Sequence, residues 1–229
     1  MKEKEIKDLI VESLKDISLL RLKVYDNTKE AFEMLKQVLQ DIVEEYNQEA
    51  LKLSEDKRLQ LTYKERGSNI VSLQVASELL VFNFHSNIFQ FNREHEIWNN
   101  PYVRISPANA FSGMITIYNF LADSFRYNRL QDLGYMVGRI FVNRQNHFIV
   151  EGKRQIGFKQ REFGKAELKP ECLKLVVERS INYALNFDLL VPPYDDIKIV
   201  SVAQMQETEQ SVRVRTGKRL GFRFNSDDV

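Results

Sequence analysis

The chain of 229 residues has no glycine before Gly67 and no proline before Pro101, although it contains nine glycines and five prolines in all. Both residues interrupt helices, so their absence permits long helices near the N-terminus. Beyond this point aromatic and β-branched residues become frequent and glycines recur, which is typical of strands joined by turns. We therefore predict an α+β fold with an N-terminal helical arm and a body built on a mostly antiparallel sheet.

Cysteine is nearly absent as well. The single Cys172 excludes an intramolecular disulfide and any zinc site built on cysteines. No apolar run approaches the roughly 20 residues of a membrane span, and the first ten residues are too highly charged for a secretion signal. These features predict a cytoplasmic protein that does not contact membranes.

Neither sign of charge dominates, because 33 basic residues stand against 32 acidic ones. The distribution is nevertheless uneven. Residues 125–166 carry nine basic and three acidic side chains, a net charge of +6, and residues 211–229 carry five and two, a net charge of +3. Each basic segment is a candidate for binding a polyanion.

The arm, residues 1–58, contains two amphipathic stretches whose apolar residues recur every three or four positions. The first stripe follows Ile6, Ile10, Ser13, Ile17, Leu20 and Val24, and the second follows Phe32, Leu35, Leu39, Ile42 and Tyr46. Between them, Asn27 followed by Glu30 predicts either the start of a second helix or a bend in one long helix. The stripes need a cover. It is either the chain's own sheet, with the arm folded back as a hairpin, or a second copy in a short coiled coil.

The body, residues 59–205, shows the pattern of several short strands and one helix. Hairpins are expected at residues 59–75 and 135–150, the latter with a turn at 143–146, and strands at 79–84 and 88–91 with a turn between them. Residues 114–121 fit a strand or a helix. A helix is expected from Pro170 to Phe187, and a short buried strand at 197–202. Residues 206–229 read as a separate basic hairpin or tail.

A surface that combines rings with basic residues is the main binding candidate. Such a surface can neutralise phosphates and stack bases, so it predicts nucleic acid or a phosphorylated ligand as partner. The stacking candidates are Phe125 and Tyr127, and the polyanion-binding candidates are Arg126, Arg129, Arg139, Arg144, Arg154, Arg213, Arg215 and Arg219. The same alternation also occurs in strands that bury their rings and leave arginines in water without any ligand.

One tripeptide offers a catalytic alternative. Glu151-Gly152-Lys153 ends a strand of a hairpin, and a helix and a strand are expected later in the chain. This order resembles the core of metal-dependent nucleases with a PD-(D/E)xK motif. The resemblance implies Mg²⁺ held by Glu151 and an upstream acid, Asp132, with Lys153 orienting the attacking water. The Pro-Asp dipeptide of that family is missing from the chain.

The expected hairpin register disfavours this alternative. A two-residue loop at Arg144 and Gln145 would pair Gly138 with Glu151 and leave Asp132 six residues further along, roughly 20 Å away. His85, His95 and His147 are scattered in the sequence and suggest no metal site unless the fold gathers them. We therefore expect a non-catalytic assembly or ligand-binding module without a cofactor, which forms a homo-oligomer or binds a protein partner through its N-terminal helices.

Overall fold

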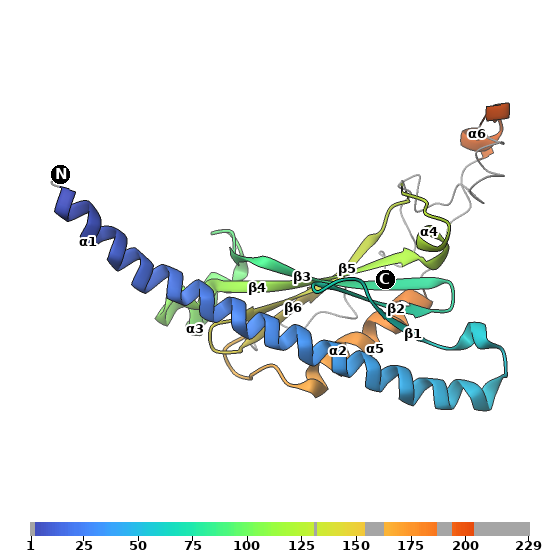
Figure 1. Cartoon of the computed structure of the whole chain (residues 1–229), viewed down its shortest axis with the longest axis horizontal. Helices are drawn as coiled ribbons and strands as arrows, with labels where there is room; N and C mark the ends of the chain where they lie inside the picture. The colour runs from blue at the N-terminus through green and yellow to red at the C-terminus, as the bar shows by residue number, and fades with distance from the viewer. Residues whose placement is uncertain (1–2, 131, 154–162, 187–193, 204–229) are drawn as a thin grey trace.

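A computed structural model of the protein describes residues 3–130, 132–153, 163–186 and 194–203. It contains a long N-terminal helix, a six-stranded antiparallel sheet and a second long helix, which confirms the α+β class (Figure 1). In chain order the elements are α1 (Glu3–Ser13), η1 (Leu14–Ser18), α2 (Leu19–Leu53), η2 (Lys57–Leu59), β1 (Thr62–Glu65), β2 (Ile70–Val75), β3 (Glu78–Gln90), η3 (Glu96–Asn99), α3 (Pro101–Ile105), η4 (Pro107–Ala110), β4 (Phe111–Leu121), α4 (Ala122–Arg126), β5 (Tyr135–Asn143), β6 (Phe148–Gly152), α5 (Pro170–Leu185) and α6 (Tyr194–Ile197).

The arm is one continuous helix and does not fold back as a hairpin. Helical backbone angles continue from α1 through η1, a stretch of π-helix, into α2. The expected helix start at Asn27 is wrong, because α2 runs through it. Asn27 is buried instead and donates a hydrogen bond from Nδ2 to the carbonyl oxygen of Asn143 at 3.0 Å. A polar residue that signals a helix start in sequence is used here to fasten the helix to β5.

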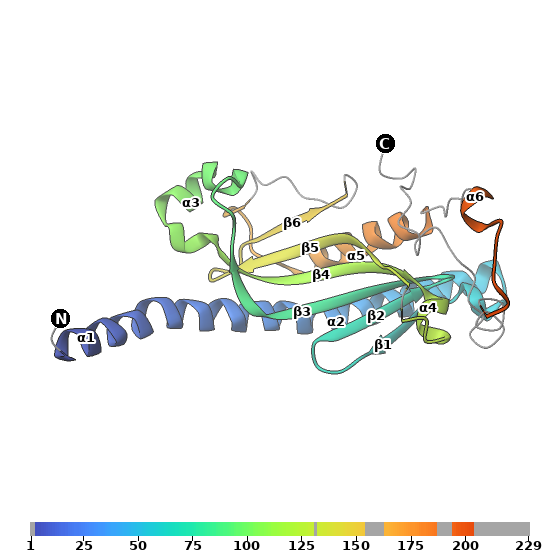
Figure 2. The same ribbon diagram turned by 90° about the horizontal axis from the view of Figure 1, so that it is seen from above.

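The core lies between one face of the sheet and the two long helices, α2 and α5 (Figure 2). Aliphatic and aromatic side chains of both layers fill it at helical and strand spacing. The largest contributions come from Phe32, Leu35, Leu39 and Ile42 of α2, Val176, Val177 and Ile181 of α5, and Leu73, Phe82, Ile115, Ile117 and Ile140 of the strands. The second apolar stripe of the arm is therefore covered by the chain's own sheet.

Helix and sheet approach each other closely between Thr28 of α2 and Gly113 of β4. A Cβ atom at Gly113 would lie 2.1 Å from Thr28 Oγ1 and 2.7 Å from Thr28 Cβ, so only glycine fits. The Thr28 hydroxyl donates to the carbonyl oxygen of Val24 at 2.7 Å, which satisfies it inside the helix. Gly113 therefore sets how near the long helix comes to the sheet.

The strands lie in chain order across the sheet, and each neighbouring pair is antiparallel. The hairpin of β5 and β6 is confirmed, but the expected register is wrong by one residue, because Arg139 and not Gly138 pairs with Glu151. The cause is a three-residue loop. Asn143 Oδ1 accepts hydrogen bonds from the backbone N–H groups of Gln145 and His147, and Asn146 has a φ of 58°.

Two further expectations are wrong. The turn at residues 85–87 is absent, since β3 continues through it with a register shift between His85 and Phe89 that absorbs the polar residues as a bulge. The buried strand at 197–202 is absent too. Ile199 is 81% exposed and Val202 is 75% exposed. A β-branched run favours a strand only where neighbouring elements cover it.

The opposite face of the sheet is covered mainly at one end. There the segment with η3, α3 and η4 forms a small second core in which Ile97, Val103 and Phe163 pack on Phe141 and Ile149. α4 lies at the other end of the sheet (Figures 1 and 2). Within the described part of the chain, none of the helices has both the length and the apolarity needed to cross a bilayer.

Candidate functional site

A groove of about 800 Å³ lies at the α4 end of the sheet. Ser72, Gln74 and Leu79 form its floor on the face opposite the long helices. The segment around η2 forms one wall and α4 forms the other. We call this site the basic groove, after the cations Arg58, Lys64, Arg66 and Arg126 in its lining.

The charges of the basic groove do not cancel. Arg58 donates from Nε to both carboxylate oxygens of Asp56 at 3.0 Å. These hydrogen bonds lower the pKa of Asp56 to about 2, so the pair stays ionised and neutral as a whole at ordinary pH. Asp123 is the other acid in the lining, against Lys64, Arg66 and Arg126. Three cations and one anion outside the Asp56–Arg58 pair give a net charge of +2.

An exposed aromatic ring lies beside these cations. The guanidinium carbon of Arg66 lies 4.7 Å from the ring centroid of Phe125, and its Nε donates to Ser72 Oγ at 3.1 Å. Phe125 is 41% exposed and packs edge-on against Phe120 at 5.2 Å. The hydrogen bond and the stacked ring hold Arg66 in place, so its planar guanidinium is pre-organised for an anion at the groove.

The structure brings together part of the basic and aromatic set expected from sequence. Phe125 and Arg126 line the basic groove, and Arg126 lies over the ring of its neighbour Tyr127 at 5.4 Å. Arg129 does not contribute. Its side chain is 5% exposed and its Nε lies 3.1 Å from Asp132 Oδ2, in a buried ion pair beneath α4.

The other predicted cations lie elsewhere. Arg139 pairs with Glu151 on the neighbouring strand, with Nε 2.7 Å from Oε2. Arg144 lies at the opposite end of β5, where its Nε donates to Asn109 Oδ1 at 3.1 Å. The nine residues of β5 span roughly 30 Å, so Arg144 cannot share a small ligand with α4. The remaining four, Arg154, Arg213, Arg215 and Arg219, lie outside the described residues.

The carboxylates of the nuclease alternative have partners of their own. Glu151 accepts from Arg139, and its Oε1 lies 2.7 Å from His95 Nε2. The Nδ1 atom of His95 accepts from the backbone N–H of Ile97 at 3.1 Å, which places the proton of neutral His95 on Nε2, facing Glu151. Asp132 accepts from the hydroxyl of Ser124 at 2.7 Å, in addition to its pair with Arg129. Lys153 follows the end of β6.

The histidines lie apart. The Nε2 atom of His85 lies 3.4 Å from Thr116 Oγ1, His95 binds Glu151, and the Nδ1 atom of His147 lies 2.9 Å from the carbonyl oxygen of Ala166. Among the described residues, His, Cys, Asp and Glu side chains form no group of three that could hold a metal ion. Cys172 is half-buried and packs against the main core.

The sequence interpretation missed Lys64 and Arg66, the groove cations supplied by β1 and its turn. Both were assigned only to a hairpin. The signal that identifies them is the period of two along a strand, which places Thr62, Lys64 and Arg66 on the same face. Lys64 and Arg66 lie near α4 because only β2 and β3 lie between β1 and β4 in the sheet. The spacing of residues in the sequence does not reveal this proximity.

Comparisons with known proteins assign the chain to no family. No protein-family model matches the chain, and no curated protein and no solved structure shows significant similarity to it.

Proposed function

We propose that this protein is a non-catalytic binding and assembly module. It binds a phosphate-bearing polyanion, with single-stranded nucleic acid as the first candidate, in the basic groove, and it uses its N-terminal helix to assemble with a protein partner. The observation that carries the first half is the set of three cations around the exposed ring of Phe125. Single-stranded ligands combine phosphates with unstacked bases, so they suit a site that offers both positive charge and a ring.

The electrostatics of the groove favour phosphates over neutral ligands. No carboxylate among the described residues forms an ion pair with Lys64, Arg66 or Arg126. Lysine and arginine stay charged well above neutral pH, and Asp56 is already ionised and paired. We therefore expect anion binding that depends strongly on salt and hardly on pH between about 5 and 9.

The test is fluorescence anisotropy with a labelled single-stranded oligonucleotide over a range of salt concentrations. Three neutralised phosphates predict a slope of log affinity against log salt of about −2. Replacing Arg66 and Arg126 by alanine should weaken binding and reduce the magnitude of that slope by about 1.4. Inorganic phosphate as competitor distinguishes a site for phosphate alone from one that also needs bases.

The matched control is Arg93→Ala. Arg93 also lies over an aromatic ring, that of Trp98 at 4.8 Å, but it precedes η3 at the opposite end of the sheet. It should leave both affinity and slope unchanged. Salt-independent binding, absence of binding at low salt, or equal loss in Arg93→Ala and the double variant would each contradict the proposal.

A further inference from the structure

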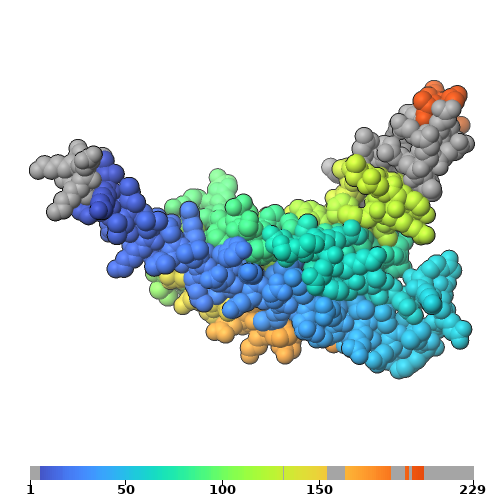
Figure 3. Space-filling model, viewed as in Figure 1, coloured from blue at the N-terminus to red at the C-terminus, as the bar shows by residue number. Residues whose placement is uncertain are grey.

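The first half of the long helix carries apolar side chains that nothing in the described chain covers. We call residues 3–22 the projecting segment, because it extends beyond the end of the sheet (Figure 3). Eight of its apolar residues are each between 43% and 58% exposed, namely Ile6, Leu9, Ile10, Val11, Leu14, Ile17, Leu19 and Leu22. An apolar surface of this size on a folded protein marks an interaction site.

The π-helical stretch η1 keeps five of these residues in one ridge. Ile6, Ile10 and Leu14 follow each other at four-residue steps, which lie on one face of an α-helix. Leu14 and Leu19 are five residues apart across η1, and five is the hydrogen-bonding step of a π turn. Leu22 follows one α-turn later. The ridge is therefore continued across η1 and ends where the sheet begins to cover the helix, at Val24.

We infer that the projecting segments of two copies pack against each other in antiparallel orientation, centred near Leu14, and join the protein into a twofold dimer. This inference rests on the assembly role proposed above and names the partner as a second copy of the chain. Most of the segment extends away from the body, so a second segment can lie along it (Figure 3), although Leu19 at its inner end borders a hollow beside Arg144 and Gln145 of the β5–β6 turn.

The available area suits a small interface. Burying an aliphatic side chain removes on the order of 100 Å² of apolar surface. The five half-exposed ridge side chains on each of two copies then remove roughly 500 Å², and since about 65% of a homodimer interface is apolar, the whole interface is roughly 800 Å². That is below the usual size of stable specific interfaces, so we expect a weak dimer that dissociates on dilution.

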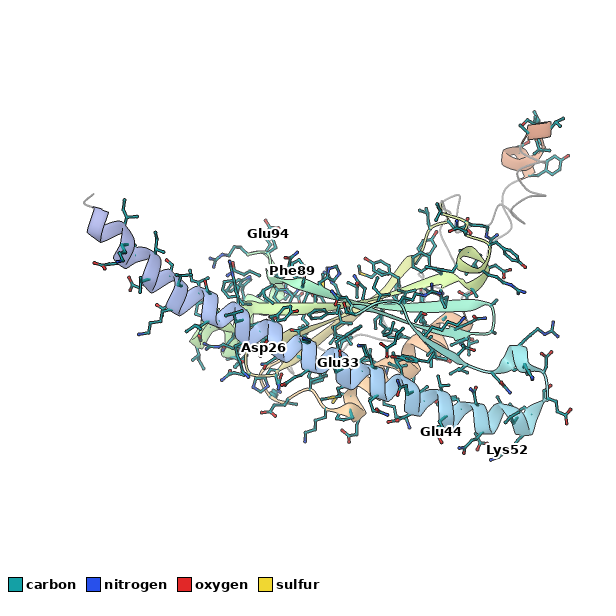
Figure 4. The ribbon with its side chains drawn as sticks, in the orientation of Figure 1. Asp26, Glu33, Glu44, Lys52, Phe89 and Glu94 are labelled. Carbon is teal, nitrogen blue, oxygen red and sulfur yellow. The ribbon has the colours of Figure 1, made fainter. Side chains whose placement is uncertain are left out.

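The charges of the helix favour the antiparallel orientation. Residues 3–13 carry two basic and four acidic side chains, a net charge of −2, whereas residues 15–23 carry three and one, a net charge of +2. An antiparallel pair places these halves opposite each other. A parallel pair would align each half with its own charge and bring the exposed residues Asp26 and Glu33 towards its copy (Figure 4).

The association is tested by sedimentation equilibrium or light scattering over a wide concentration range. The wild type should pass from the mass of one chain, 27.0 kDa, towards twice that mass. Ile10→Glu combined with Leu14→Glu should raise the dimer dissociation constant more than about 100-fold, because four carboxylates would enter an apolar contact. Both positions are exposed in the single chain, so circular dichroism should be unchanged.

The matched control is Leu51→Glu combined with Leu53→Glu, which adds the same two carboxylates at apolar residues that are 55% and 85% exposed at the far end of α2. It should dimerise like the wild type. A wild type that stays monomeric at high concentration, or a double variant that dimerises normally, would overturn the inference. Oligonucleotide binding by the same variants reports on the basic groove separately, so failure of the dimer and failure of the groove are distinguishable.

Cross-linking tests the orientation. In a Cys172→Ser background, which removes the only cysteine, Ile6→Cys and Leu22→Cys variants of different tag length are mixed and oxidised. Antiparallel packing predicts a disulfide between the two variants, since these positions face each other across the centre at Leu14. Disulfides within the Ile6→Cys population alone would indicate a parallel pair and overturn the orientation.

Discussion

Both halves of the long helix carry an apolar stripe, but the two stripes have opposite surroundings. Between Val24 and Ile42 the apolar stripe is buried against β3, β4 and β5. Between Ile6 and Leu22 an equally apolar stripe is exposed. Amphipathic spacing therefore shows that a face requires a cover, but it does not show which surface provides that cover.

Small and polar residues, in addition to the apolar stripe, distinguish the covered half. The covered half meets the sheet through Thr28, which fits against Gly113, and through Asn27, which binds the backbone of Asn143. These contacts fix where the helix lies along the strands. The projecting segment lies beyond the sheet, so its leucines and isoleucines stay available for another surface (Figure 1).

The largest expected effect is a difference in unfolding free energy between alanine variants of the two halves. Phe32→Ala should lower the free energy of unfolding by about 3–5 kcal/mol, because Phe32 is 1% exposed and its removal leaves a cavity in the core. Leu14→Ala, in the projecting segment, should change the stability of the monomer by less than about 0.5 kcal/mol. Urea denaturation at low protein concentration measures both, with dimerisation suppressed by dilution.

Equal losses of stability in the two variants would break the comparison. They would mean that the projecting segment is covered by its own chain in solution. A concentration-dependent loss in Leu14→Ala alone would instead support the dimer, since its stability is linked to association.

A smaller effect is expected where helix and sheet come closest. Gly113→Ala should destabilise the protein by about 1–3 kcal/mol, because the added methyl group overlaps Thr28 and pushes α2 away from β4. Thr28→Ala removes the nearest atom but leaves its Cβ atom, so the double variant should be less destabilised than the sum of the single variants. Additive losses would show that the two residues do not limit the packing distance.

Much of the fold follows from local sequence signals. The absence of glycine and proline before Gly67 and the apolar spacing indicate the long helix, and Pro170 marks the first turn of α5. The hairpin of β5 and β6 follows from the polar residues 143–146. These features depend on neighbouring residues only, which is why they can be recognised without a structure.

The errors involve side-chain partners that spacing in the sequence does not identify, some distant in the chain and some near. Asn27 looks like a helix cap, but it binds Asn143, which is 116 residues away. Arg129 looks like a surface cation, but Asp132 and the fold of α4 bury it. The residues of the basic groove were predicted only in part, because some of them are distant from the others in the chain. Phe125 and Arg126 were recognised, whereas Arg66 was not, because only the order of the strands brings β1 near α4.

The smallest expected effect lies at the edge of the covered half, where Tyr63 of β1 packs beside α2. Burial, together with a hydrogen bond to Glu65, raises the pKa of Tyr63 to about 12. The unfolded chain releases this proton near pH 10, so the contribution of Tyr63 to stability is present below pH 10 and is lost as the pH rises towards 12.

In Tyr63→Phe this loss cannot occur. The stability of the wild type relative to the variant should therefore fall over this range, by less than about 1 kcal/mol because the hydroxyl is partly solvated. Urea denaturation of both proteins at successive pH values measures the difference. If the curves of unfolding free energy against pH run parallel, β1 does not hold the neutral form of Tyr63 against the helix.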